Sequence, residues 1–99
     1  MSNIKNGNNF TNITLAAPTT TVVKTGGGNL KRIIINKTTA NGVITIYDNT
    51  AASGTLIGTI TMPATVLNTS LTFEYDCRFS TGLTIVTATA AQDITVVWN

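Results

Sequence analysis

The chain has 99 residues, of which 42% are hydrophobic and only 10% are charged, and its formal net charge is +2. This length suits one domain with a single, modest core. Histidine is absent and cysteine occurs once, at Cys77, which excludes an intramolecular disulfide, a cysteine-based zinc cluster and catalysis that depends on a histidine base.

The charged fraction is far below the roughly 25% of ordinary soluble domains, and threonine makes up roughly a fifth of the chain. Two interpretations stay open: the exterior is neutral and hydrogen-bonding, or other subunits cover much of it, since interface cores are depleted in charge. Lys31 and Arg32 are the adjacent basic pair, and adjacent strand residues point to opposite faces. Without a concentrated basic surface, nucleic-acid binding is not expected.

Residues 1–9 are polar, with four asparagines, and Ile4 and Lys5 stand among them. We expect a flexible N-terminal arm at 1–9, disordered alone or ordered on a partner, and one β-sandwich or barrel domain at 10–99. The start of the chain lacks the apolar run of a signal peptide, and no run reaches the length of a membrane span. Synthesis in a cytoplasm and no membrane association are therefore expected.

Short β-branched runs with a period of two predict strands along the rest of the chain. The expected strands are 10–16, 20–24, 30–37, 43–47, 56–60, 71–75, 82–87 and 93–98. Ile33, Ile34 and Ile35 in succession predict a central strand with apolar residues on both faces. No stretch has the spacing of an amphipathic helix. The prediction is an all-β fold, a single antiparallel β-sandwich or small jelly-roll-like barrel of seven to eight short strands.

The connections between these runs carry turn signals. Gly26–Gly28 predicts a turn, because no Gly-Lys-Ser/Thr follows to make a phosphate loop. Asn41-Gly42 predicts a hairpin that joins 30–37 to 43–47, and Gly58 predicts a bulge or a close backbone approach.

Further along the chain, Pro63 predicts an irregular crossing between sheets at 62–69, with Val66 and Leu67 plugging one end of the core. At 71–75, strict alternation places Leu71, Phe73 and Tyr75 inward. The last two runs predict a terminal hairpin.

Acidic residues offer two candidate chemistries. Glu74 and Asp76 share a strand face if the strand extends that far, as a carboxylate pair for glycoside hydrolysis would require. The ordinary alternative is pairing with Arg32 or Arg78. Asp48 with Asn49 is a conceivable calcium site, but its loop lacks repeated acids. We expect no catalytic residues, metal or cofactor, and a non-enzymatic protein.

Aromatic side chains are the candidate anchors of a protein interface. Trp98 is in phase with Ile94 and Val96, which predicts burial in the core or at a subunit interface. Tyr47 lies opposite the apolar Ile46 face of its strand, so both faces need cover. Phe79 lies in a connection, where its ring must either tuck under the loop or meet a neighbouring subunit. The expected partner-interface residues are Ile4, Lys5, Phe10, Lys31, Arg32, Tyr47, Phe79 and Trp98.

The runs at 30–37, 44–50, 79–87 and 93–97, with the segment Ser80-Thr81-Gly82-Leu83-Thr84, resemble a known group. They are similar to the small all-β virion proteins of tailed bacteriophages, in particular capsid decoration (cement) proteins, over about residues 30–99. The resemblance implies a protein present in many copies on the capsid surface, often as a homotrimer, which binds the major capsid protein and bridges capsomers. It implies no catalytic residues.

Two other functions remain possible from the sequence. A head–tail connector, tail or fibre component would use the same fold in few copies, and a carbohydrate-binding β-sandwich module would need exposed aromatic side chains. For the decoration protein, residues 1 to about 16 would extend and add a strand to a neighbouring subunit. Lys5, Lys24, Lys31 and Arg32 would either meet an acidic capsid surface or be solvated.

Overall fold

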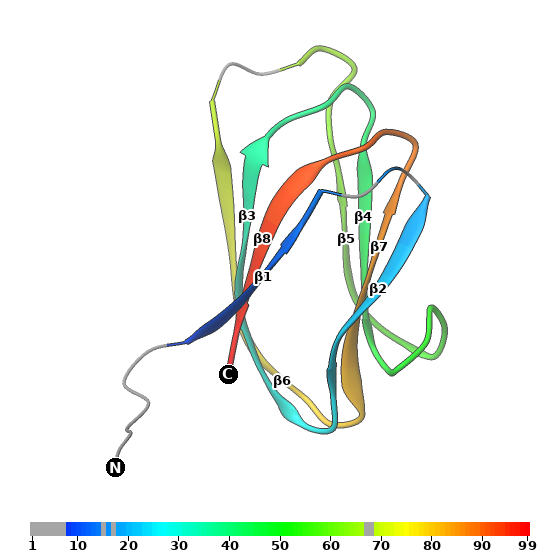
Figure 1. Cartoon of the computed structure of the whole chain (residues 1–99), viewed down its shortest axis with the longest axis vertical. Helices are drawn as coiled ribbons and strands as arrows, with labels where there is room; N and C mark the ends of the chain where they lie inside the picture. Colours follow the sequence, from blue (N-terminus) through cyan, green and yellow to red (C-terminus); the bar gives the residue numbers. More distant parts are fainter. Residues whose placement is uncertain (1–7, 15, 17, 67–68) are drawn as a thin grey trace.

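The computed structural model describes residues 8–14, 16, 18–66 and 69–99, and its described residues contain strands but no helix (Figure 1). The strands are β1 (Asn9–Ile13), β2 (Thr19–Thr25), β3 (Gly28–Lys37), β4 (Val43–Asp48), β5 (Thr55–Thr61), β6 (Leu71–Phe79), β7 (Gly82–Ala88) and β8 (Asp93–Trp98). β1 includes Asn9, which the sequence assigns to the arm, and residues 1–7 of that arm lie outside the described part. Because β1 pairs with β8 of the same chain, the expectation that residues up to about 16 extend to a neighbouring subunit is wrong over 9–13.

The eight strands form two four-stranded antiparallel sheets. Sheet A has the strand order β1-β8-β3-β6 and sheet B has the order β2-β7-β4-β5. Consecutive described strands therefore change sheet at each connection except β4–β5 (Figure 1). This is the strand order of a jelly roll, so the predicted all-β sandwich is confirmed. β3 lies between β8 and β6, which confirms it as a central strand.

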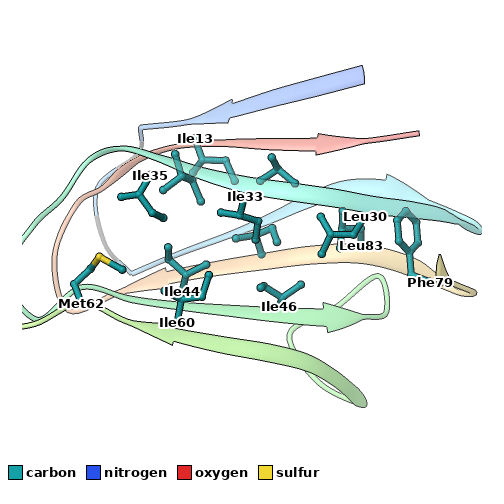
Figure 2. Packing of buried hydrophobic residues seen from close by; sticks show 13 residues of the cluster. Ile13, Leu30, Ile33, Ile35, Ile44, Ile46, Ile60, Met62, Phe79 and Leu83 are labelled. Carbon is teal, nitrogen blue, oxygen red and sulfur yellow. The ribbon is translucent and has the colours of Figure 1, made fainter. Parts of the chain in front are cut away.

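The core lies between the two sheets and is built from inward-facing residues of every strand except β2, together with Met62 of the β5–β6 connection (Figure 2). Its members are Ile13, Leu30, Ile33, Ile35, Ile44, Ile46, Ile60, Met62, Phe79, Leu83, Ile85, Ile94 and Val96. A fully buried side chain of this kind contributes about 1.5–3 kcal/mol. Leu71, Phe73 and Tyr75 are half-buried and pack against this core, as their alternation predicts. Ile34 is half-buried on the opposite face of β3.

Asn41 and Gly42 do not close a hairpin, because β3 belongs to sheet A and β4 to sheet B. Asn41 does adopt the positive φ expected of this dipeptide, at 62°. The turn instead crosses between the sheets and pairs with the β5–β6 connection: the Asn41 N–H donates to the Pro63 carbonyl and the Met62 N–H donates to the Gly42 carbonyl. The five residues 38–42 can span about 17 Å, more than the ~10 Å between packed sheets.

The predicted terminal hairpin is also wrong, since β7 pairs with β2 and β4 while β8 pairs with β1 and β3. The predicted alternation is nevertheless present, because Leu83 and Ile85 of β7 and Ile94 and Val96 of β8 are all fully buried. They approach one another across the core from different sheets. A period of two identifies the buried face of a strand but not its neighbour in the sheet.

The β5–β6 connection crosses between sheets as predicted, but Val66 does not plug the core, because its side chain is 55% exposed. Leu67 lies outside the described residues. Met62, 3% exposed, closes this end of the core instead, opposite Phe79 at the other end (Figure 2). The bulge predicted at Gly58 is present: the β4–β5 register shifts here, and a Cβ at this position would lie 2.8 Å from Tyr75 Oη.

Candidate protein interface

Away from the ends of its strands, the outward face of sheet B carries no charged residue among the described positions; Lys24 lies near the end of β2 and Asp48 ends β4. In the strand register, partners share a face of the sheet, so the residues that alternate with the buried Ile44, Ile46, Leu83 and Ile85 point outward. We call this surface the uncharged face. It consists of Thr20, Val22, Val43, Thr45, Tyr47, Leu56, Thr59, Thr61, Thr84, Val86 and Ala88.

The uncharged face is organised in rows that run across the four strands. Its central row aligns Thr20, Val86, Thr45 and Thr59, which are short, β-branched side chains that give a flat surface. Such a surface can be desolvated without burying a charge. It therefore has the composition of an interface core, in which charged residues are depleted.

A second row ends in the most exposed apolar side chains of sheet B. Val22 on the β2 edge is 47% exposed and Leu56 on the β5 edge is 53% exposed. Tyr47, a predicted interface residue, lies half-buried between them as the register partner of Leu56. Thr84 in the same row is fully buried, because the β4–β5 loop covers it. Its hydroxyl donates to the carbonyl of Asn49 in that loop at 2.7 Å.

The outward face of sheet A is charged. Lys31 Nζ pairs with Asp76 Oδ1 at 2.9 Å, and Arg32 Nε pairs with Glu74 Oε2 at 3.0 Å. The expectation that Lys31 and Arg32 point to opposite faces is wrong, because the register of β3 shifts between Leu30 and Arg32. This irregularity lets both cations reach acids on the exposed side of β6.

The two ion pairs also define the environment of the candidate carboxylate pair. The Lys31 ammonium, through its hydrogen bond and its charge, lowers the pKa of Asp76 below its ordinary value. Glu74 is bound to Arg32, as the ordinary alternative predicts, and both acids lie on an exposed strand face. The geometry describes paired surface ions rather than a general acid beside a general base. Surface pairs of this kind contribute little to stability.

The hydrogen-bond partners of Asp48 contradict the hypothesis that it binds calcium. Its carboxylate accepts hydrogen bonds from the backbone N–H groups of Ser80, Thr81 and Gly82, at 2.8–3.4 Å. These bonds lower the pKa of Asp48, with the Ser80 bond the largest cause. N–H donors occupy the position that a cation would need. Among the described residues, no three His, Cys, Asp or Glu side chains gather as a metal site.

Phe79 is fully buried within its own chain, which is one of its two predicted placements and excludes the other, contact with a partner. β6 continues to Phe79 instead of ending at Tyr75, and Asp76 adopts a positive φ of 49° beside the register shift in this strand. The ring thereby turns into the core next to Gly28, where an added Cβ would lie 2.8 Å from Phe79 Cζ.

The remaining predicted interface residues divide into three groups. Phe10 is 73% exposed on β1, at the edge of sheet A. Trp98 packs against the protein's own core, as one of its two predicted placements requires, and its indole N–H donates to Thr11 Oγ1 at 3.3 Å. Ile4 and Lys5 lie outside the described residues.

Comparison of the chain with known protein families, with curated proteins and with solved structures finds no match. The described residues also contain no helix that is long and apolar enough to cross a membrane.

The uncharged face as a whole is the feature that sequence reasoning missed. Its signal is present in the sequence, since the four strands of sheet B contain only two charged residues, Lys24 near the end of β2 and Asp48 at the end of β4. Recognising it requires the knowledge that these four segments form one sheet, and the strand pairing alone provides that.

Proposed function

We propose that this protein is a non-enzymatic structural protein of a tailed-bacteriophage particle, a decoration (cement) protein that binds the outside of the head and stabilises neighbouring capsomers. The observation that carries the proposal is the segregation of charge between the two sheets. A jelly roll whose one outward face lacks charge over its central rows, and whose other face carries two exposed ion pairs, is suited to adhere by the first face and to meet water with the second.

The partner of the uncharged face in this proposal is the major capsid protein, and further contacts join copies of the chain into a homo-oligomer, a trimer being the arrangement that the resemblance implies. Phe10, exposed on the edge strand β1 of sheet A, lies away from the uncharged face and would serve the contacts between copies. The ion pairs of Lys31 and Arg32 support a solvated role for these cations rather than contact with nucleic acid. The protein would be made in the host cytoplasm and reside in the virion.

A connector, tail or fibre component is the rival within the same class, and copy number separates the two. Quantitative mass spectrometry of purified particles from the source of this chain should find hundreds of copies, in fixed proportion to the major capsid protein. A handful of copies would place the chain at the neck or tail. Its absence from particles would refute the virion function.

The role of the uncharged face is tested by a lysine at its centre. Thr45→Lys places a charge in the central row, and burying that charge at an interface should weaken attachment to undecorated heads by at least tenfold, measured by co-sedimentation. The matched control is Thr72→Lys, which adds the same side chain on the exposed face of sheet A. Equal attachment of the two variants would contradict the assignment of this face.

A further inference from the structure

The four edge strands of the sandwich differ in how well they are protected against pairing with another chain. Sheet A ends in β1 and β6, and sheet B ends in β2 and β5 (Figure 1). An edge strand directs half of its backbone N–H and C=O groups away from its own sheet, and proteins block such an edge with charged side chains, proline or bulges. These features decide which edge can accept a further strand.

Three of these edges are blocked. β6 carries the exposed charged residues Glu74, Asp76 and Arg78, and its register with β3 shifts. β2 carries Lys24, and its register with β7 shifts beside this residue. β5 lacks charge, but its register with β4 shifts beside Gly58. A shift of this kind bends the strand and interrupts the regular spacing of backbone groups that a further strand needs.

β1 has none of these features. Its five residues, Asn-Phe-Thr-Asn-Ile, include neither a charged residue nor proline, and they pair with successive residues of β8 without a shift. Phe10 in this strand is 73% exposed, more than any other large hydrophobic side chain among the described residues. β1 is therefore the edge that is open to a further strand.

The strand that best fits this edge is β1 of a second copy. Two copies related by a twofold axis between their Thr11 residues pair antiparallel, with Phe10 of each copy opposite Asn12 of the other. Both side chains are exposed on the outward side of sheet A, so the pairing leaves the two cores unchanged and buries no charge. β1 against any of the other three edges would instead meet a register shift.

We propose that this protein forms a homodimer in which the β1 strands of two copies pair by their outer edges. Sheet A then continues through the contact as one sheet of eight strands, four from each copy. β1 stays in the sheet of its own chain, and each Phe10 ring packs across the outward side of the other β1 strand. The contact is twofold and closes at two copies, so it is distinct from any threefold contact between copies.

The symmetry of this dimer also fixes the direction of its uncharged faces. The twofold axis of an antiparallel pair runs perpendicular to the sheet, so the B sheets of both copies lie on the same side of the joined sheet and their uncharged faces point the same way. If these faces bind the shell, as the proposed function states, attachment through two sites raises the avidity by about 10²–10⁴. That extension rests on the proposed function, whereas dimerisation of the isolated chain does not, so a failure of either one is visible separately.

The test is sedimentation equilibrium of the full-length protein, which should give the mass of two copies at high concentration and of one copy on dilution. Phe10→Lys places a lysine on the open edge, as natural edges have, and should raise the dissociation constant of the dimer at least tenfold. The matched control is Thr72→Lys, on the exposed side of β6 at the other edge of sheet A, which should leave the dissociation constant unchanged. Far-ultraviolet circular dichroism establishes that each variant is folded.

Amide hydrogen exchange separates pairing of the strand edges from packing of the Phe10 ring alone. In the dimer, the β1 amides that point away from β8 should exchange at least tenfold more slowly than in the diluted monomer, whereas the amides of β6 should exchange equally in both. A protein that stays monomeric up to about 1 mM, a dimer that Phe10→Lys leaves intact, or β1 amides that exchange equally in both states would each overturn the proposal. An assembly of three copies would also overturn it, because a twofold contact joins copies in pairs.

Discussion

Asp48 fastens the β6–β7 turn to the end of β4, and its replacement by asparagine tests how much this contact stabilises the domain. The carboxylate accepts from three successive backbone N–H groups, of Ser80, Thr81 and Gly82. Asparagine would offer one acceptor oxygen and turn an amide donor toward the same N–H groups. Hydrogen bonds to a charged group contribute about 1.5–3 kcal/mol, and because Asp48 is only half-buried, solvent competition reduces the effect.

We therefore expect Asp48→Asn to lower the free energy of unfolding at pH 7 by about 1.5–2 kcal/mol, which corresponds to a Tm decrease of roughly 6–16 °C for a domain of this size. Urea unfolding followed by tryptophan fluorescence measures the change. The matched control is Glu74→Gln, which breaks an exposed ion pair and should change the stability by no more than about 1 kcal/mol.

The pH dependence of this difference provides the sharper test. The pKa of Asp48 is lowered in the folded state from its ordinary value of 3.8, so its contribution is fully present above the unfolded-state pKa. It is lost as the pH falls through the lower folded-state pKa. The stability difference between the unaltered protein and Asp48→Asn should accordingly be constant from pH 7 to about 5 and shrink below 4. An equal difference at pH 3 and pH 7 would refute the role of the charge.

Three further predictions concern stability and reactivity. Phe79→Ala should cost about 3–5 kcal/mol in urea unfolding because it empties a fully buried site, whereas Phe10→Ala, at an exposed site, should stay within about 0.5 kcal/mol; similar costs would contradict the assigned burial. Gly28→Ala should lower the unfolding free energy by about 1–3 kcal/mol, because its Cβ would lie 2.6 Å from the Asn99 carbonyl oxygen; an unchanged Tm would contradict this. Cys77 should react with iodoacetamide at pH 7 more slowly than a free thiol, because burial, followed by the charges of two acids, raises its pKa; reaction at the free-thiol rate would show that it is exposed.

The candidate interface was only partly accessible from the sequence. Low charge predicts that some surface is covered, but it does not say which, and half of the predicted interface residues are aromatic. Phe79 is buried because β6 extends beyond the alternating segment 71–75 and has a bulge at Asp76. No local sequence pattern predicts this bulge. Val22 and Leu56 belong to the candidate interface only because the strand register aligns them in one row of sheet B.

The sequence by itself determined the strands, their inward faces and therefore the all-β class, because the alternation of side chains along a strand is a local property of the backbone. Ile33, Ile35, Ile94 and Val96 are buried where their period places them. The tertiary structure alone decided which strands are neighbours. Asn41-Gly42 favours a tight turn, yet the β3–β4 connection is long enough to cross between the sheets. The crossing is favoured because it lets the apolar faces of β3 and β4 pack against each other in one core. Sheet pairing depends on contacts between residues far apart in the sequence, and it also brings the uncharged outward residues of four strands together on one face.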